Sequence, residues 1–276
     1  MAAGDCMSGS RTAQFHISGA ALKNIAYLSM FIDHFFAVII LNYLWMTAVD
    51  GVWDTKLKII YRAGRAIGRI AFILFAHQIV EGFLHTRSRG KLLLRLGVFA
   101  ILSEIPFDLA FSGMVFDWNS QNIFFTLFLG VLVLIVWDRL VRYQGVVFII
   151  ARWMVLLSGC AAAYWGKTDY RYMGVLLIFV FYKAHERNLA DKILLAGCVM
   201  LLGTWSANCL RYLDDGYTVL ELFRTSLREM YGLAAFILIG LYYGEKGHQP
   251  PKWFCYGFYP VHLLFLYGAA RYIGVM

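Results

Sequence analysis

The sequence has little charge for its length. Only 15% of its 276 residues are Asp, Glu, Lys or Arg, whereas 61% are hydrophobic, which is far more apolar than an ordinary soluble domain. Apolar runs long enough to cross a bilayer core as a helix, about 20 residues, recur along the chain. Alternating segments of the kind that build membrane barrels are lacking. The sequence therefore predicts an all-α, polytopic membrane helix bundle.

Hydropathy indicates roughly nine transmembrane helices. They lie near 24–46, 66–84, 92–111, 121–137, 145–164, 170–182, 190–206, 230–243 and 254–274. Residues 1–20 are polar and lack the apolar core of a secretory signal, so we expect a polar tail followed by a single membrane domain over 21–276. Of the two longer polar stretches, 47–65 and 207–229, the second carries an amphipathic pattern typical of a surface helix.

Cysteine and charge exclude other classes. The five cysteines are scattered, with no close pairing to each other or to histidine, so we expect neither a disulfide framework nor a metal site. The formal net charge of +8 could suit nucleic acid, but in a membrane chain excess cations first serve anchoring and orientation. We expect no nucleic-acid partner. The distribution of cations modestly favours a cytoplasmic N-terminus.

Ionisable residues concentrate in the first three predicted spans. At membrane depth such groups are costly, and they are candidates for a functional site. They are Asp33 and His34 in the first span, Arg65, Arg69, His77 and Glu81 in the second, and Arg95, Glu104 and Asp108 in the third. Any one of them could belong to a structural ion pair, for example Asp33 with Arg69. Together they favour a chemical site or an ion path.

Helical spacing indicates which groups share a face. Lys23 and His34 are eleven residues apart, which places both on one helix face about 16 Å apart along the axis. Asp33 points about 100° away from His34, so we expect its partner on another span. His34 suits a general base or a transient acyl carrier. A buried arginine such as Arg69 could hold an oxyanion or a phosphate.

A basic cluster lies where the second and third spans meet. Arg87, Arg89, Lys91 and Arg95 could bind the phosphates of a soluble donor, or they could simply anchor the chain at the inner membrane surface.

Six motifs stand out along the chain: LKNIAYLSMFIDHF, RAIGRIAFILFAHQIVEGFLHTRSRGKLLLRLGVFAILSEIPFDLAF, QNIFFTLFLG, TDYRYMGVLLIFVFY, LYYGEKG and FYPVHLLFLY. In their order and separations they resemble the TraX family of bacterial multi-span membrane proteins, which is named for the enzyme that N-acetylates conjugative pilin. The resemblance covers about residues 21 to 271. The chain also resembles, more weakly, the acyltransferase 3 family, whose first span carries Arg or Lys, ten residues, then an essential His. Lys23 and His34 have that spacing.

The resemblance implies an acyltransferase of the bacterial cytoplasmic membrane. The acetyl group would come from cytoplasmic acetyl-CoA and pass to an amine or hydroxyl of a pilin subunit, a surface glycan or a small amine. His34 would be catalytic, with Asp33 beside it and Lys23 toward the CoA, whose phosphates Arg87, Lys91 and Arg95 would bind. By the same resemblance the site would be lined by Arg65, Arg69, Glu81, Glu104, Asp169, Tyr170 and His262. Where the family pattern leads us to expect proline, this chain has Ile73, so a helix kink there is in doubt.

Two functions of other classes compete with the enzyme. In a secondary transporter or proton-coupled channel, Asp33, His34, Glu81 and Glu104 would relay protons. In a non-catalytic membrane component of a conjugation apparatus, replacing Lys23 and His34 would leave the phenotype intact.

Overall fold

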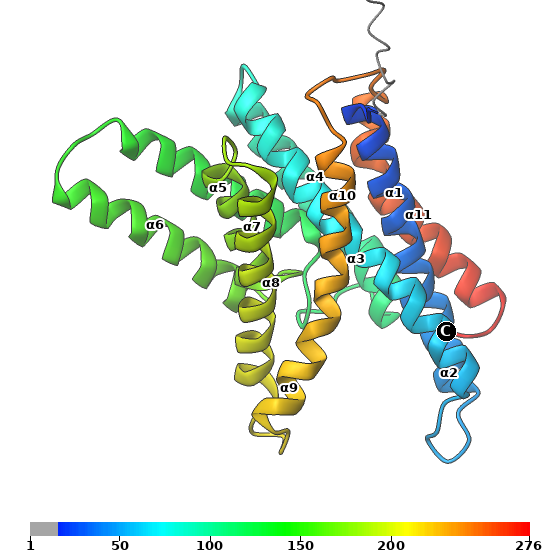
Figure 1. The fold of residues 1–276 in the computed structure, drawn as a ribbon. Helices are drawn as coiled ribbons and strands as arrows, with labels where there is room; N and C mark the ends of the chain where they lie inside the picture. The colour runs from blue at the N-terminus through cyan, green and yellow to red at the C-terminus, as the bar shows by residue number, and fades with distance from the viewer. Residues whose placement is uncertain (1–15) are drawn as a thin grey trace, which may run out of the picture.

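The structure is a computed structural model, and it describes residues 16–276. Most of the predicted polar tail, together with Cys6, falls outside these residues. The described part is all helical (Figure 1), with no β-strand beyond isolated bridges. The predicted all-α membrane bundle is confirmed.

Nine helical stretches form the described bundle, and two of them are segmented. The elements are α1 (Gly19–Phe35), the π-helix η1 (Phe36–Ile40), α2 (Leu41–Met46), α3 (Thr55–His85), α4 (Arg89–Ser112), α5 (Ile123–Val141), α6 (Val146–Trp165), α7 (Arg171–Lys183), α8 (Leu189–Tyr212), α9 (Val219–Ser226), the 3₁₀-helix η2 (Leu227–Ala234), α10 (Ala235–Gly240) and α11 (Lys252–Tyr272). In α1–η1–α2 and in α9–η2–α10 the helical elements follow one another without a gap.

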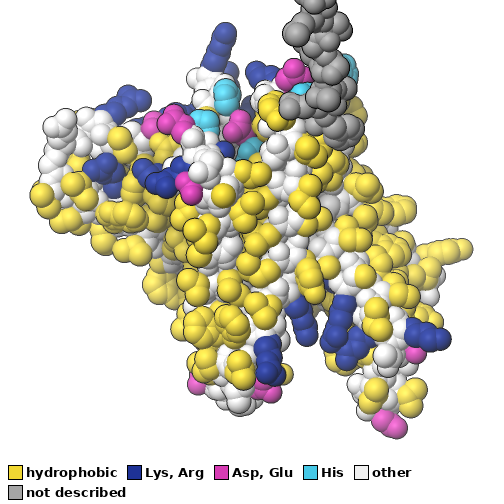
Figure 2. Space-filling model, viewed as in Figure 1, with side chains coloured by type: hydrophobic (Ala, Val, Ile, Leu, Met, Phe, Trp, Pro, Cys, Tyr) yellow, Lys and Arg dark blue, Asp and Glu magenta, His cyan; other side chains and the backbone are white. Residues whose placement is uncertain are grey.

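Within residues 16–276, five helical segments are long and apolar enough to cross a bilayer. They are Gly19–Met46, Thr55–His85, Ile123–Val141, Val146–Trp165 and Leu189–Tyr212. Figure 2 shows the matching surface on the viewed face: a broad hydrophobic band separates two zones in which Lys, Arg, Asp and Glu gather. The chain is therefore a multi-pass membrane protein, because a bilayer core covers only such an apolar band.

The second predicted span is longer than hydropathy indicates. The structure begins α3 at Thr55, eleven residues before the predicted start, so most of the stretch 47–65 is helix. Asp54 caps this end, since its side chain accepts a hydrogen bond from the backbone N–H of Leu57 at 2.8 Å. Lys56, Lys58 and Arg62 lower the hydropathy of these turns without breaking the helix, because long cationic side chains can reach the headgroup region. Similarly, most of 207–229 belongs to α8 and α9.

Two helices start inside the bundle rather than at its surface. Asn122 caps α5 and bonds the carbonyl of Ala100 at 2.7 Å, near the middle of α4. The ring of Tyr170, which precedes α7, stacks on Phe72 of α3 with centroids 3.8 Å apart. The loops that precede the two helices are hydrogen-bonded to each other, since the N–H of Gln121 donates to the Lys167 carbonyl at 3.0 Å. Buried loop backbone at this depth is tolerated because its polar groups are paired within the protein.

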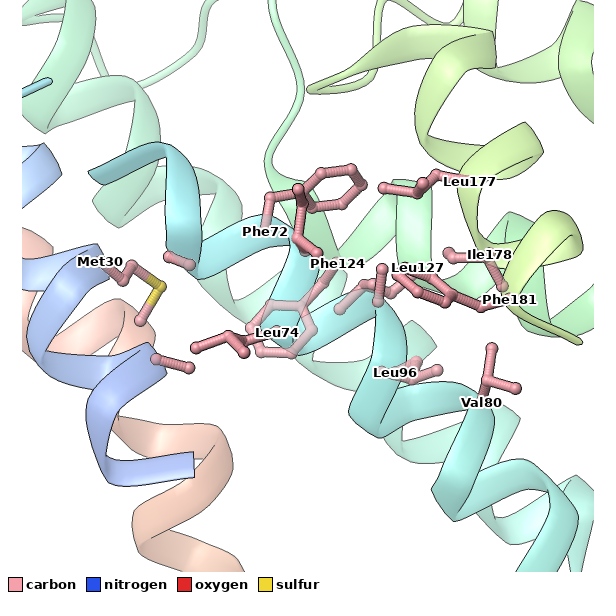
Figure 3. Close-up of a cluster of buried hydrophobic side chains, with 14 of the residues drawn as sticks. Met30, Phe72, Leu74, Val80, Leu96, Phe124, Leu127, Leu177, Ile178 and Phe181 are labelled. Carbon is pink, nitrogen blue, oxygen red and sulfur yellow. The ribbon is translucent and has the colours of Figure 1, made fainter. Parts of the chain in front are cut away.

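The core lies between α1, α3, α4, α5 and α7. Figure 3 shows Met30, Leu74, Leu96, Phe124 and Ile178 among the side chains that fill it. Leu74, Leu96 and Ile178 are almost fully buried. This apolar packing fixes the helices that carry the ionisable residues of the first three spans.

Candidate active site

A cavity of about 590 Å³ extends between α1, α3, α4, α5 and α11, with the residues just before α7 on one side. Its walls are mainly apolar, with Met30, Phe72, Leu96, Phe124 and Leu127 among the lining side chains. One end lies at the first turn of α1 and the last turn of α3, and the other reaches residues 33, 34, 169 and 170 near mid-height of the bundle. It is a deep apolar pocket with polar groups at its two ends, as is typical of a small-molecule site.

Two histidines form a hydrogen-bonded pair at the inner end. His34 Nδ1 lies 2.6 Å from His262 Nε2, and His262 Nδ1 lies 2.7 Å from the carbonyl oxygen of Phe258. A carbonyl only accepts, so His262 Nδ1 carries a hydrogen. With both rings neutral, His262 Nε2 accepts from His34 Nδ1, and His34 Nε2 keeps a free lone pair. His34 lines the cavity, and this nitrogen has no hydrogen-bond partner in the described chain.

Ion pairs surround the base of the cavity. Arg65 donates to Asp33 Oδ2 at 2.7 Å and to the Asp33 carbonyl at 3.2 Å. Arg69, one turn further along α3, pairs with Glu229 of η2 at 2.9 Å. The second oxygen of Asp33 is buried without a hydrogen-bond partner among residues 16–276. Each arginine therefore balances a carboxylate that would be costly alone at this depth.

Backbone irregularity coincides with these groups. The π-helix η1 begins two residues after His34, and such segments inside α-helices are frequent at functional sites. Near the other side of the cavity floor, Lys167, Tyr170 and Arg171 all have positive φ, at 51°, 58° and 44°. Non-glycine residues adopt this conformation only at a cost in free energy, which contacts with the surrounding structure must offset. Both features lie next to residues that line the cavity, Asp33 and His34 on one side and Asp169 on the other.

The outer end of the cavity is cationic. Lys23 Nζ donates to Gln249 Oε1 at 2.6 Å, and Arg95 Nε donates to the Tyr256 hydroxyl at 3.2 Å. Lys23, Arg95 and Lys246 belong to the lining, together with His85 and one acid, Glu81, so cations outnumber acids at this end. Anionic groups of a ligand would be attracted to this rim, whereas its uncharged part would fit the apolar walls.

The comparison with known proteins identifies the family. A model described as TraX protein matches residues 18–270. The chain belongs to the TraX family. It is also 26% identical, over 264 residues, to the "Probable fimbrial assembly protein FimC, serogroup H1" of Dichelobacter nodosus, and the match covers 93% of this chain and 97% of that protein. No solved structure matches the chain.

The structure distributes the predicted site residues of this TraX-family protein in two layers. Those that line the cavity are Lys23, Asp33, His34, Glu81, Arg95, Asp169 and Tyr170. Those behind the lining are Arg65 and His262, which contact it through Asp33 and His34. Arg69 also lies behind the lining and pairs with Glu229, which is itself outside the lining. Glu104 accepts a hydrogen bond from the Asn122 backbone at 3.2 Å. Arg87 and Lys91 are exposed and do not line the cavity.

The structure decides two sequence predictions, one for Asp33 and one for Ile73. Asp33 does find its partner on another helix, but that partner is Arg65 rather than Arg69. Ile73 is fully buried in an uninterrupted α3 and is not part of the cavity lining. The departure from the TraX pattern therefore leaves the pocket wall unchanged and α3 without a proline kink.

Glu229, Tyr259 and Gln249 were not singled out from the sequence. Glu229 is the partner of Arg69, and Tyr259 packs its ring 5.7 Å from that of His34. Arg65 and Arg69 lie one turn apart on α3, but α1 offers a single acid, Asp33. The second arginine therefore needs another acid at the same depth, and this requirement is the sequence signal that could have indicated Glu229. Tyr259 is three residues before His262, so helical spacing places both on one face of α11. No sequence signal indicates Gln249.

Replacing Gly68 by alanine is expected to separate α1 from α3. A Cβ at Gly68 would lie 2.0 Å from Asp33 Oδ1 and 2.3 Å from Asp33 Cβ, so the helices must shift. We expect a loss of about 1–3 kcal/mol, as for overpacking in a core, measured by thermal unfolding in detergent. Gly82→Ala, in the same helix, meets nothing within 4 Å and should be neutral or slightly stabilising. Equal behaviour of the two variants would contradict the close contact.

Proposed function

We propose that this protein is a membrane acyltransferase that moves an acetyl group from acetyl-CoA to an amine or hydroxyl, with His34 as general base. The observation that carries the proposal is the free Nε2 of His34 at the inner end of a deep cavity with a cationic rim. An imidazole held in one tautomer is suited to take a proton and return it near neutral pH.

The shape and charge of the cavity support a CoA thioester as the donor. The thioester arm is narrow and uncharged, which suits the apolar walls, and the head of CoA carries phosphates, which suit Lys23, Lys246 and Arg95 at the rim. By helix geometry, Lys23 lies about 16 Å along α1 from His34. An extended donor could therefore keep its phosphates at the rim while its acetyl group reaches His34.

The reaction requires one proton to be taken up and returned. His34 Nε2 removes a proton from the acceptor as the acceptor nitrogen or oxygen bonds to the acetyl carbonyl carbon. The carbon–sulfur bond of the thioester then breaks, and the His34 imidazolium gives the proton to the departing CoA sulfur. His262 Nε2 accepts from His34 Nδ1 throughout, which stabilises the imidazolium as a hydrogen-bonded orienting group does.

We propose that the rim faces the bacterial cytoplasm, where acetyl-CoA is available. The first turn of α1, the α3–α4 turn and the start of α11 lie on one face of the bundle (Figure 1). The loops on this face hold Arg87, Arg187 and Lys246, and Lys183 ends α7 there. The positive-inside rule favours a cytoplasmic side for such cation-rich connections.

The name of the Dichelobacter nodosus relative favours a pilin-like acceptor. That protein is named for fimbrial assembly, so we propose a fimbrial or pilin subunit as acceptor ahead of a surface glycan or a small amine. The same name supports a second candidate, a non-catalytic membrane component of pilus assembly. In that case the cavity would have no acyl donor to bind.

The test uses the full chain in nanodiscs with acetyl-CoA labelled on its acetyl group, with and without a membrane extract. CoA release that the extract stimulates, with label in a product, is expected. Gly82→Leu should raise the KM for acetyl-CoA at least tenfold, because residue 82 lines the cavity and its added side chain points into open space. Gly268→Leu also meets open space but lies outside the cavity, so its kinetics should match the wild type.

If folded protein neither binds nor turns over acetyl-CoA, the proposed acyltransferase function is wrong. Solute or proton flux into liposomes that depends on Asp33 would then favour transport. An intact pilus phenotype with the Lys23→Ala and His34→Ala variants would favour the assembly component.

A further inference from the structure

A second cavity, of about 390 Å³, opens between the start of α4 and the last half of α5. Its apolar wall is formed by Leu93 of α4 and by Leu132, Ile135 and Val136 of α5. A groove with such a wall in a membrane helix bundle fits a hydrocarbon chain.

Three arginines, Arg89, Arg139 and Arg142, line the same groove. Only Arg89 has an ion-pair partner in the described chain, Asp138, and that acid is shared with the Tyr182 hydroxyl at 3.1 Å. Arg89 is also held 4.2 Å above the ring of Phe83.

The other two arginines leave the groove with more cations than neighbouring acids. Arg139 and Arg142 are exposed, and neither forms an ion pair within residues 16–276. Arg89 is held by its ion pair, whereas Arg139 and Arg142 have none, so this end of the groove has a surplus of positive charge. An anionic ligand group bound there would balance that charge.

Aromatic side chains beside the groove favour a position at headgroup level. The ring of Tyr143, just after α5, stacks on Phe148 with centroids 5.0 Å apart, and aromatic side chains of this kind concentrate at membrane interfaces. Basic pockets between membrane helices at this level suit lipid headgroups.

The groove is separate from the candidate active site. On α4 it is lined by residues 89, 90 and 93, whereas the larger cavity is lined by 92, 95 and 96. These sets face different sides of the helix, about 100° apart. The cations of the groove therefore do not belong to the rim proposed for CoA.

We infer that this groove binds an anionic phospholipid. The headgroup phosphate lies between Arg139 and Arg142 near Arg89, and one acyl chain follows Leu93, Leu132 and Ile135. The lipid would tie α5 to α4 at the end where the α5–α6 hairpin projects from the bundle (Figure 1). This binding does not depend on the proposed acyltransferase activity.

The experiment measures lipid retained by the full chain in native mass spectrometry, after titration with phosphatidylglycerol or phosphatidylcholine in detergent. The wild type is expected to keep one phosphatidylglycerol in preference to phosphatidylcholine. In Arg139→Gln/Arg142→Gln the apparent affinity for phosphatidylglycerol should fall about thirtyfold, since two cations near an anionic headgroup are lost. Arg224→Gln/Arg228→Gln, on α9 and η2 outside the groove, removes the same charge and should change nothing.

A second variant tests the groove without changing charge. Gly90 lines it, and a Cβ there meets nothing within 4 Å, so Gly90→Leu should fill the space and displace the lipid. Equal retention of the two lipids by the wild type would overturn the inference. The inference would also be overturned if Arg139→Gln/Arg142→Gln kept the preference for phosphatidylglycerol. The same holds if Gly90→Leu kept that preference, because the lipid would then be attracted to the charged surface in general rather than bound in the groove.

Discussion

Replacing His34 by alanine is expected to lower acetyl transfer from acetyl-CoA by about 10²–10⁴-fold, the usual contribution of a positioned general base. His34 supplies the free imidazole nitrogen at the inner end of the cavity, and the described lining offers no second histidine at that end. The measurement is single-turnover transfer of labelled acetyl in nanodiscs, with acetyl-CoA binding as the control. Unchanged turnover in a folded variant would remove His34 from the mechanism.

His262 should behave differently, because it acts through His34. In His262→Phe the Nδ1 hydrogen of His34 loses its acceptor, so the tautomer with a free Nε2 is no longer selected. We expect a loss of about ten- to a hundredfold, by analogy with groups that orient a functional imidazole, and a displaced pH profile. In His262→Gln a side-chain oxygen can accept again, and activity should partly return. A loss with an unmoved pH profile would indicate a structural role only.

Removing Arg65 should be the most destabilising single change at the cavity base. Arg65→Leu leaves Asp33 without its 2.7 Å partner. Breaking a fully buried pair on one side costs about 3–5 kcal/mol, and because this pair is only partly buried we expect a loss toward the lower end of that range. The double variant Asp33→Leu/Arg65→Leu removes both charges and should recover most of that stability. Thermal unfolding in detergent measures both.

Additive losses in the double variant would contradict this account, because they would mean that each side chain contributes independently. Arg62→Leu, one turn nearer the start of α3 and exposed, is the matched control and should change the unfolding temperature little.

The sequence predicts helices better than it predicts their neighbours. Hydropathy located the nine helical stretches, since burial in lipid requires long apolar runs, and the spacing of Lys23 and His34 placed both on the cavity wall. Helical periodicity gives a face but not the residue across from it. The choice of Arg65 over Arg69 as the partner of Asp33 depends on the close contact at Gly68, which only the packed structure contains.

Irregular segments account for most of the remaining differences. The inward starts of α5 and α7 bring Asn122 and Tyr170 beside the middle of α4 and α3, although hydropathy treats their surroundings as span ends. The charged first turns of α3 and the 3₁₀-helix that carries Glu229 likewise fall below any hydropathy threshold. These segments are stabilised by helix caps and ion pairs, and an average of hydropathy over a window of residues does not detect such interactions.

In the proposed mechanism, the depth of His34 would couple its proton transfer to the membrane voltage. The residue lies close to the middle of the segment Gly19–Met46, so a proton that reaches it from either face crosses about half of the transmembrane field. A unit charge that crosses the whole field changes in energy by about 2.3 kcal/mol per 100 mV. Half of that, about 1.2 kcal/mol, corresponds to about a sevenfold change in rate. An energised membrane would thus set the speed of any step that charges this imidazole, and detergent would abolish that control.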